Sequence, residues 1–241
     1  MVRARGGGPM FGGPMFLEIP QLVDAEELAA IRAALGEAAP WVDGRATAGH
    51  QGASVKHNRQ LDADSAVARD LGALIINRLE RNALFISATL PYRVFPPMFN
   101  RYDVGMQFGS HVDGAIRQIP GTGLKLRTDV SATLFLTPPD AYEGGELIVD
   151  GDFGSRSAKL AAGDLLVYTS TARHRVAPVT VGRRLACVFW VQSLIRDDVK
   201  RSQLFELDRT IQELTQDGAD RESLVRLTGH YHSLLRLWSE V

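Results

Sequence analysis

The chain has 241 residues, of which 45% are hydrophobic and 23% charged, and its formal net charge is -1. This composition is typical of a globular protein, and the balanced charge gives no electrostatic reason to expect binding to nucleic acid or to an acidic membrane. No apolar run approaches the roughly 18 residues that a transmembrane helix requires. A single cysteine, Cys187, cannot form an internal disulfide, which favours a buried thiol and a reducing, cytoplasmic location.

The N-terminal part combines a glycine- and proline-rich start with one predicted strand and one predicted helix. Residues 1–14 lack the apolar stretch of a signal peptide, so we interpret them as a disordered leader, or as an upstream extension with Met15 as the natural start. A short strand is predicted from Phe16 to Ile19. Asp24 and Glu27 form a helix-capping pattern, and the apolar spacing that follows predicts a helix to about Ala39.

The next stretch is polar, apart from a second helix. Residues 41–54 are predicted to be a loop or an irregular strand, and residues 56–60 a polar segment between structured parts. A helix is predicted from about Asp64 to Leu79. Its apolar residues share one side and nothing on it suggests catalysis, so we expect it to pack against a sheet.

From Leu90 onward the pattern changes to short strands separated by turn residues. Many short strands at near-regular spacing predict a sandwich or a barrel. No helix fits between them, so the sheet should be largely antiparallel. The predicted strands are Tyr92 to Tyr102, Gly105 to Val112, Val130 to Leu136, Glu146 to Val149, Ser157 to Leu160, Asp164 to Tyr168, His174 to Val179 and Arg183 to Gln192.

After Arg196 the pattern returns to helix. Two apolar stripes with spacings of three and four residues flank Gln216 to Gly218, which predicts a helical hairpin. We expect residues 197–241 to dock on a single core domain formed by residues 15–196. The two stripes can pack on the core or on each other, or one of them can form a homodimer contact.

The stretch F-G-S-H-V-D-G contains a histidine and an aspartate, His111 and Asp113, two residues apart. On one extended strand these side chains would point to the same side. A second histidine, His174, follows several predicted strands later. Two histidines and one carboxylate on one face of a metal are the ligand set of non-haem iron oxygenases. The alternatives are a hydrogen-bonded surface pair for the first two residues and a buried structural role for His174.

The last predicted strand begins with two arginines, Arg183 and Arg184. A guanidinium at the mouth of an apolar strand suits a carboxylate, which it can bind through two parallel hydrogen bonds. Residue spacing alone does not choose between them, and both can also be solvated at the edge of a hairpin.

Six segments of the chain resemble the PKHD-type hydroxylases, a bacterial branch of the prolyl-4-hydroxylase-like Fe(II)/2-oxoglutarate dioxygenases. The resemblance extends from about Met15 to the C-terminus. The segments are P-P-M-F-N-R-Y (96–102), F-G-S-H-V-D (108–113), R-T-D-V-S-A-T-L-F-L (127–136), Y-E-G-G-E-L (142–147), G-D-L-L-V-Y (163–168) and H-R-V-x-P-V-T-x-G-x-R (174–184).

The resemblance implies a mainly β fold, a double-stranded β-helix (jelly roll) of the cupin type with flanking helices. It implies that His111, Asp113 and His174 bind Fe(II), and that Arg184 pairs with the distant carboxylate of 2-oxoglutarate. Dioxygen and 2-oxoglutarate would be the co-substrates, with succinate and carbon dioxide released as an unactivated C–H bond of an unidentified substrate is hydroxylated. Ascorbate would keep the iron reduced.

Several assignments stay open on the sequence. Tyr102 can donate a hydrogen bond to 2-oxoglutarate or serve only in packing. Lys56 and Asn58 are weak candidates for substrate contact, and Arg127 with Asp129 is expected to be a salt bridge. The alternative functions are a non-catalytic sensor of metal or 2-oxoglutarate that signals through the C-terminal helices, and a cupin that uses zinc or manganese for isomerase or hydrolase chemistry.

Overall fold

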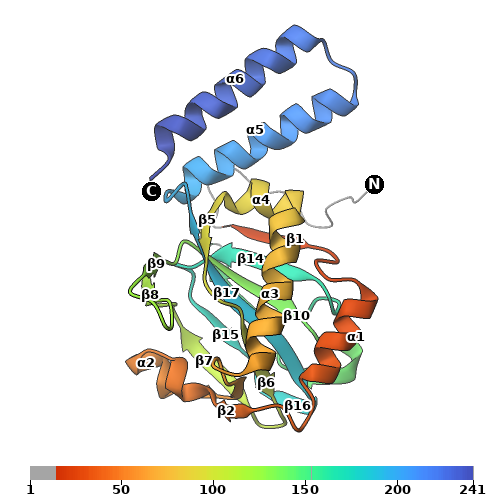
Figure 1. Cartoon of the computed structure of the whole chain (residues 1–241), viewed down its shortest axis with the longest axis vertical. Coiled ribbons are helices and arrows are strands. Elements are labelled where there is room, and N and C mark those ends of the chain that lie inside the picture. The colour runs from red at the N-terminus through yellow and green to blue at the C-terminus, as the bar shows by residue number, and fades with distance from the viewer. Residues whose placement is uncertain (1–14, 153, 241) are drawn as a thin grey trace.

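Two antiparallel sheets form the centre of the molecule in a computed structural model that describes residues 15–152 and 154–240 (Figure 1). The predicted leader, residues 1–14, lies outside the described residues. The larger sheet has the order β1 (Phe16–Ile19), β14 (Leu165–Thr169), β10 (Val130–Phe135), β17 (Arg184–Ser193), β6 (Met98–Tyr102), β4 (Arg59–Leu61) and β2 (Trp41–Asp43), and β5 (Pro91–Val94) also pairs with β17. The smaller sheet has the order β13 (Gly154–Ala158), β12 (Leu147–Gly151), β15 (His174–Val176), β7 (Gln107–His111) and β3 (Lys56–His57).

The remaining strands form two separate two-stranded sheets. The hairpin of β8 (Ile116–Gln118) and β9 (Lys125–Arg127) and the pair of β11 (Tyr142–Gly144) and β16 (Val179–Gly182) are both antiparallel. Every strand pair among the described residues is therefore antiparallel, which confirms the predicted fold class.

The outer face of the larger sheet is covered by helices. These are α1 (Ala25–Ala34), α3 (Ala66–Arg81) and α4 (Ala83–Thr89), and their apolar residues share one core cluster with the sheet. The predicted capping box of α1 is present, because the Asp24 side chain accepts from the Glu27 backbone N–H and the Glu27 side chain accepts from the Asp24 N–H. The expectation that the second helix packs on a sheet is thus confirmed.

Alternation along β17 separates the helix side of the larger sheet from the side that faces the smaller sheet. Leu185, Cys187, Phe189 and Val191 belong to the cluster under the helices. Cys187 is fully buried, and burial raises the pKa of its thiol, as expected for a cysteine that serves in packing. The intervening residues Arg184, Val188 and Trp190 line the space between the sheets.

The polar segment 56–60 was predicted to lie between structured parts, and this prediction is wrong. It contains β3, which pairs with β7 in the smaller sheet, and β4, which pairs with β6 in the larger one. Lys56, Asn58 and Gln60 are buried, and the Lys56 Nζ lies 3.3 Å from the Gln60 Oε1. Because these inward positions are polar, the segment lacks the apolar alternation that marks a strand.

Other boundaries also differ from the predictions. The expected loop at residues 41–54 contains β2, the short 3-10 helix η1 (Gly44–Thr47) and α2 (His50–Ala53). The expected strand from Tyr92 to Tyr102 is divided into β5 and β6 around Pro96 and Pro97, which lack the N–H that a strand ladder needs.

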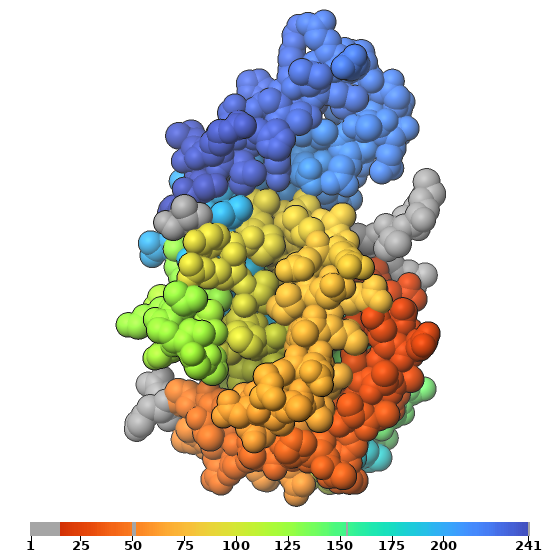
Figure 2. All heavy atoms as spheres, in the orientation of Figure 1, coloured from red at the N-terminus to blue at the C-terminus, as the bar shows by residue number. Residues whose placement is uncertain are grey.

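The C-terminal helices α5 (Asp198–Gln216) and α6 (Arg221–Trp238) form a lobe at one end of the molecule (Figure 2). Arg201 in the first turns of α5 is fully buried. It donates to the Ile195 carbonyl at 2.8 Å and pairs with Asp198, which links the start of α5 to the segment that precedes it.

The apolar stripe of α6 packs inside this lobe. Tyr231, Leu234 and Trp238 join a cluster with Leu204 of α5 and with Leu90 from the core. For these residues the structure confirms that the stripes pack on each other and on the core. Among the described residues, no helix has the length and apolarity needed to cross a bilayer.

The packing of α3 provides a test of the fold. Ile75 is fully buried, and its replacement by alanine should lower the free energy of unfolding by about 2–5 kcal/mol, because it leaves a cavity under the helix. Asn77→Ala on the exposed side of the same helix should change it by no more than about 0.5 kcal/mol. Urea unfolding of both variants measures the difference, and equal effects would contradict the assigned packing.

Candidate active site

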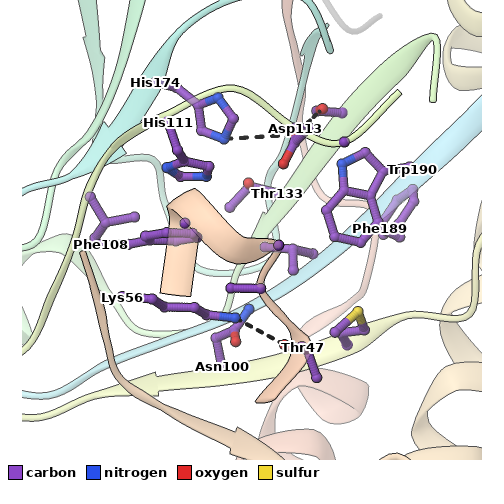
Figure 3. A pocket seen from close by; sticks show the side chains of 18 of the residues that line it. Thr47, Lys56, Asn100, Phe108, His111, Asp113, Thr133, His174, Phe189 and Trp190 are labelled. Atoms are coloured by element: carbon purple, nitrogen blue, oxygen red, sulfur yellow. Dashed lines mark hydrogen bonds and ion pairs between the residues drawn. The ribbon is translucent and has the colours of Figure 1, made fainter. Parts of the chain in front are cut away.

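A cavity of about 630 Å³ lies between the two sheets and opens to the surface. The smaller sheet contributes Phe108, His111 and His174, and the larger sheet contributes Asn100, Tyr102 and Arg184. Figure 3 shows the histidines and Asp113 at one side of this cavity and Trp190 beside Asp113. Such a volume is ample for a small ligand that is largely enclosed.

The two histidines lie directly opposite each other on paired strands. His111 of β7 and His174 of β15 are register partners, and their ring centroids are 4.2 Å apart. Asp113 was expected on the same strand as His111, but β7 ends at His111 and the aspartate lies in the loop that follows. The three side chains nevertheless converge, with one potential ligand atom from each within 4.8 Å of the others.

Backbone carbonyls orient both imidazoles. The His111 Nδ1 lies 2.8 Å from the Gly109 carbonyl oxygen, and the His174 Nδ1 lies 3.1 Å from that of Ala172. A carbonyl only accepts hydrogen bonds, so each Nδ1 carries a proton, and in the neutral tautomer this leaves the lone pair on Nε2. The His174 Nε2 lies 3.7 Å from the Asp113 Oδ2. A hydrogen bond from Nδ1 to a backbone carbonyl is a usual way in which metal-binding histidines are held.

Burial keeps His111 uncharged. Loss of solvent, and then the nearby His174, lower the pKa of His111 to about 4, so the ring is neutral at physiological pH. The ring also stacks on Phe108, with the centroids 3.6 Å apart. A neutral imidazole in a fixed orientation is the form that a divalent metal requires.

A serine positions the carboxylate of Asp113. The Ser131 hydroxyl on β10 donates to the Asp113 Oδ2 at 2.6 Å and lies 2.8 Å from the Ser170 hydroxyl. Ser131 and Thr133, which both line the cavity, were not predicted from the sequence. Their signal was polar residues at alternate positions of the otherwise apolar strand V-S-A-T-L-F.

The two adjacent arginines have different surroundings. Arg183 is on the outside, where it pairs with Asp103 at 2.8 Å and with Glu37. Arg184 is only 2% exposed, lines the cavity and lies over the rings of Tyr102 and Phe135. No carboxylate within the described ranges pairs with Arg184, and its Nε has no hydrogen-bond partner there. A buried guanidinium without a counter-ion is poised to bind an anionic ligand.

Of the remaining predicted site residues, some line the cavity and others do not. Lys56 lines the cavity, whereas Asn58 lies behind it and donates to the Asn100 Oδ1 at 3.1 Å. The expected salt bridge of Arg127 with Asp129 is present at 2.7 Å, and neither residue lines the cavity.

Two family models match this chain. The model of the 2OG-Fe(II) oxygenase superfamily matches residues 97–192, and that of the PKHD-type hydroxylase C-terminal domain matches residues 198–240. A PKHD-type hydroxylase from Paraburkholderia phymatum is 54% identical over 226 residues, which cover 94% of this chain and 100% of that protein. Another from Cupriavidus pinatubonensis is 56% identical over 229 residues with the same coverage.

The chain belongs to the PKHD-type hydroxylase family. It is therefore an oxidoreductase of the 2OG-Fe(II) oxygenase superfamily, a hydroxylase that uses Fe(II), 2-oxoglutarate and dioxygen. The relatives span its length from near the start to the C-terminal helices, so the family includes the helical lobe as well as the sheets.

Solved structures with low sequence identity share the fold. The carbocyclase SnoK of nogalamycin biosynthesis, an α-ketoglutarate-dependent enzyme, aligns with a TM-score of 0.53 at 16% identity over 73% of this chain and 79% of that one. HygX from Streptomyces hygroscopicus, solved with nickel, 2-oxoglutarate and hygromycin B, gives 0.52 at 17% identity over 76% and 84%. These likenesses confirm the jelly-roll fold of the two sheets.

The lowered pKa of His111 predicts how the metal-free protein responds to acid. Between about pH 6.5 and pH 4 the unfolded chain binds a proton on this residue that the folded chain does not, so stability is lost as the pH falls through this window. From about pH 7 to pH 5 the wild type should lose about 1–2 kcal/mol more than His111→Asn.

Urea unfolding of the metal-free protein at both pH values measures this difference. His230→Asn, which removes an exposed histidine of α6, should lose as much stability as the wild type. Identical losses in the wild type and in His111→Asn would contradict the assignment.

Proposed function

We propose that His111, Asp113 and His174 hold Fe(II) and that Arg184 binds the distal carboxylate of 2-oxoglutarate. The observation that supports this most strongly is the arrangement of the cavity. Three metal-ligand side chains converge at one side, and a buried, unpaired arginine lines the same space. Two imidazoles and one carboxylate match the ligand preference of iron in this class of enzyme.

Bound iron supplies, with 2-oxoglutarate and dioxygen, the oxidising chemistry that hydroxylates an unactivated C–H bond and releases succinate and carbon dioxide. The protein contributes orientation and charge. Gly109 and Ala172 fix the tautomers of the two histidines, and Ser131 holds the carboxylate of Asp113. Arg184 offers two parallel N–H donors to a carboxylate, which fixes both the position and the direction of 2-oxoglutarate.

Tyr102 supports Arg184 in this proposal. Its ring lies 5.3 Å from the guanidinium carbon, and it is the register partner of Arg184 in the adjacent strand. Burial raises the pKa of the Tyr102 hydroxyl, which therefore stays protonated and can donate a hydrogen bond to 2-oxoglutarate.

Four broader assignments complete the proposal. Residues 15–196 form the catalytic domain and residues 197–241 a helical hairpin docked on it. Ascorbate serves as the reductant that keeps the iron in its ferrous state. The protein is cytoplasmic, in agreement with one buried cysteine and no disulfide. A homodimer through α5 and α6 stays a prediction.

The proposed function is tested by reconstituting the protein with Fe(II) without oxygen and then adding 2-oxoglutarate and air. Slow formation of succinate is expected even without the primary substrate. His174→Ala should abolish both iron binding and succinate formation, because it leaves only two ligands. His232→Ala on α6 is the matched control and should retain both. Iron binding by His174→Ala at wild-type affinity would reject the assigned ligands.

The arginine assignment is tested separately. Arg184→Met should weaken 2-oxoglutarate binding at least about tenfold and leave iron binding intact, because a charged two-point contact is lost. Arg183→Met should change neither, since that side chain pairs with surface carboxylates. Calorimetric titration of 2-oxoglutarate into the anaerobic iron protein measures both variants. A larger effect from Arg183 than from Arg184 would reverse the assignment.

A further inference from the structure

The cavity contains a second buried cation, Lys56, that the proposed function does not use. Lys56 is 8% exposed and lines the same cavity as the histidines (Figure 3). Its Nζ lies 3.1 Å from the Thr47 hydroxyl and 3.3 Å from the Gln60 Oε1, and 5.3 Å from the centre of the Phe108 ring. All these contacts are uncharged, and no carboxylate of the described chain forms an ion pair with Lys56.

A third cation, Arg117, lines the cavity from the β8–β9 hairpin. Its guanidinium carbon lies 3.9 Å from the centre of the Trp190 ring and 5.0 Å from that of Phe95, so aromatic rings hold the group in place. Its Nη2 donates to the Thr47 carbonyl at 3.4 Å, which joins the hairpin to the η1 segment. No described carboxylate pairs with Arg117 either.

The charges of the cavity do not balance without a further anion. Asp113 is the single acidic residue among the described residues that line it, against the cations Lys56, Arg117 and Arg184. Fe(II) adds two positive charges, and 2-oxoglutarate brings two negative ones. Two positive charges then remain in a space partly shielded from water, where an unpaired charge is costly.

Unpaired hydrogen-bond donors lead to the same conclusion. The Nε of Arg117 and the indole Nε1 of Trp190 are both buried without a partner in the described structure, and both residues line the cavity. Arg184 is the third lining residue with such an atom, and the proposed 2-oxoglutarate accounts for it. An acceptor on a further ligand would satisfy the other two, because a buried N–H without a partner is unfavourable.

We propose that the primary substrate carries an anionic oxygen group, a carboxylate or a phosphate, and that Lys56 and Arg117 bind it. The proposal rests on the proposed function, since it adds the unknown substrate to the same cavity. The fork of Arg117 suits two oxygens of one planar or tetrahedral anion, and Lys56 adds a point charge.

The positions of Lys56 and Arg117 also limit where the substrate can lie. The Lys56 Nζ and the Arg117 guanidinium both contact Thr47, at 3.1 Å and 3.4 Å, and both residues line the same cavity as Asp113. An anion held between them would keep the rest of a small substrate beside the three ligands. Lys56 and Arg117 would act as binding residues that determine specificity, without taking part in the chemistry.

Anion binding can be measured without knowing the substrate. The protein is loaded with Fe(II) and saturating 2-oxoglutarate without oxygen, and sodium acetate and inorganic phosphate are titrated in separate experiments by calorimetry. The wild type should bind at least one of them. Lys56→Met, which keeps the apolar stem, and Arg117→Gln, which keeps a planar group, should each weaken that binding about tenfold or more.

Lys125→Met is the matched control, because Lys125 is an exposed cation on the same hairpin as Arg117. It should bind both probes as the wild type does. Affinity for 2-oxoglutarate, measured in every variant, should stay unchanged and also shows that each variant is folded. If Arg117→Gln loses affinity for 2-oxoglutarate, the comparison of acetate and phosphate binding is made with Lys56→Met and Arg117→Lys instead.

The outcomes separate the two proposals. A wild type that binds neither iron nor 2-oxoglutarate would overturn the proposed function itself. A wild type that binds both, yet binds acetate and phosphate no more tightly than Lys56→Met and Arg117→Gln, would overturn the anionic substrate alone. Tighter binding of acetate assigns the site to a carboxylate, and tighter binding of phosphate assigns it to a phosphate ester.

Discussion

The antiparallel pairing of β7 with β15 is the contact on which the candidate active site depends. It sets His111 directly opposite His174, although the two residues are far apart in the sequence. A shift of one residue in this register would turn one imidazole to the other face of the sheet, because side chains alternate along a strand. The surrounding strands of both sheets keep this register by burying their apolar residues.

Electrostatics distinguishes this cavity from an ordinary protein core. Three cationic side chains surround it, with one carboxylate among its described lining residues. Aromatic rings hold Arg184 and Arg117, and neutral hydrogen bonds hold Lys56, so these charges are fixed in position but not neutralised. Ligands that bring negative charge can neutralise them, which is the basis of the proposal that the primary substrate is an anion.

The sequence predicted some features of the site correctly because they depend on residue type and local alternation. Arg184 and Trp190 share one face of β17, and Cys187 lies on the other, where its thiol is buried as expected. Polar strands were harder to recognise. The segment 56–60 contains β3 and β4, but its buried side chains are polar, such as Lys56 and Gln60, which contact each other. The segment therefore lacks the alternation of apolar residues that marks a strand.

The sequence by itself determined the antiparallel β class, the two C-terminal helices and the set of two histidines, one aspartate and an arginine that indicates iron and 2-oxoglutarate. The family resemblance pointed to Arg184 over Arg183, and the tertiary structure added the physical reason: Arg184 is buried in β17 opposite Tyr102 of β6, whereas Arg183 pairs outside with Asp103. The tertiary structure also brought Arg117 from a separate hairpin onto Trp190. Contacts between distant segments depend on how strands pair and sheets pack, and neither is visible in local sequence patterns.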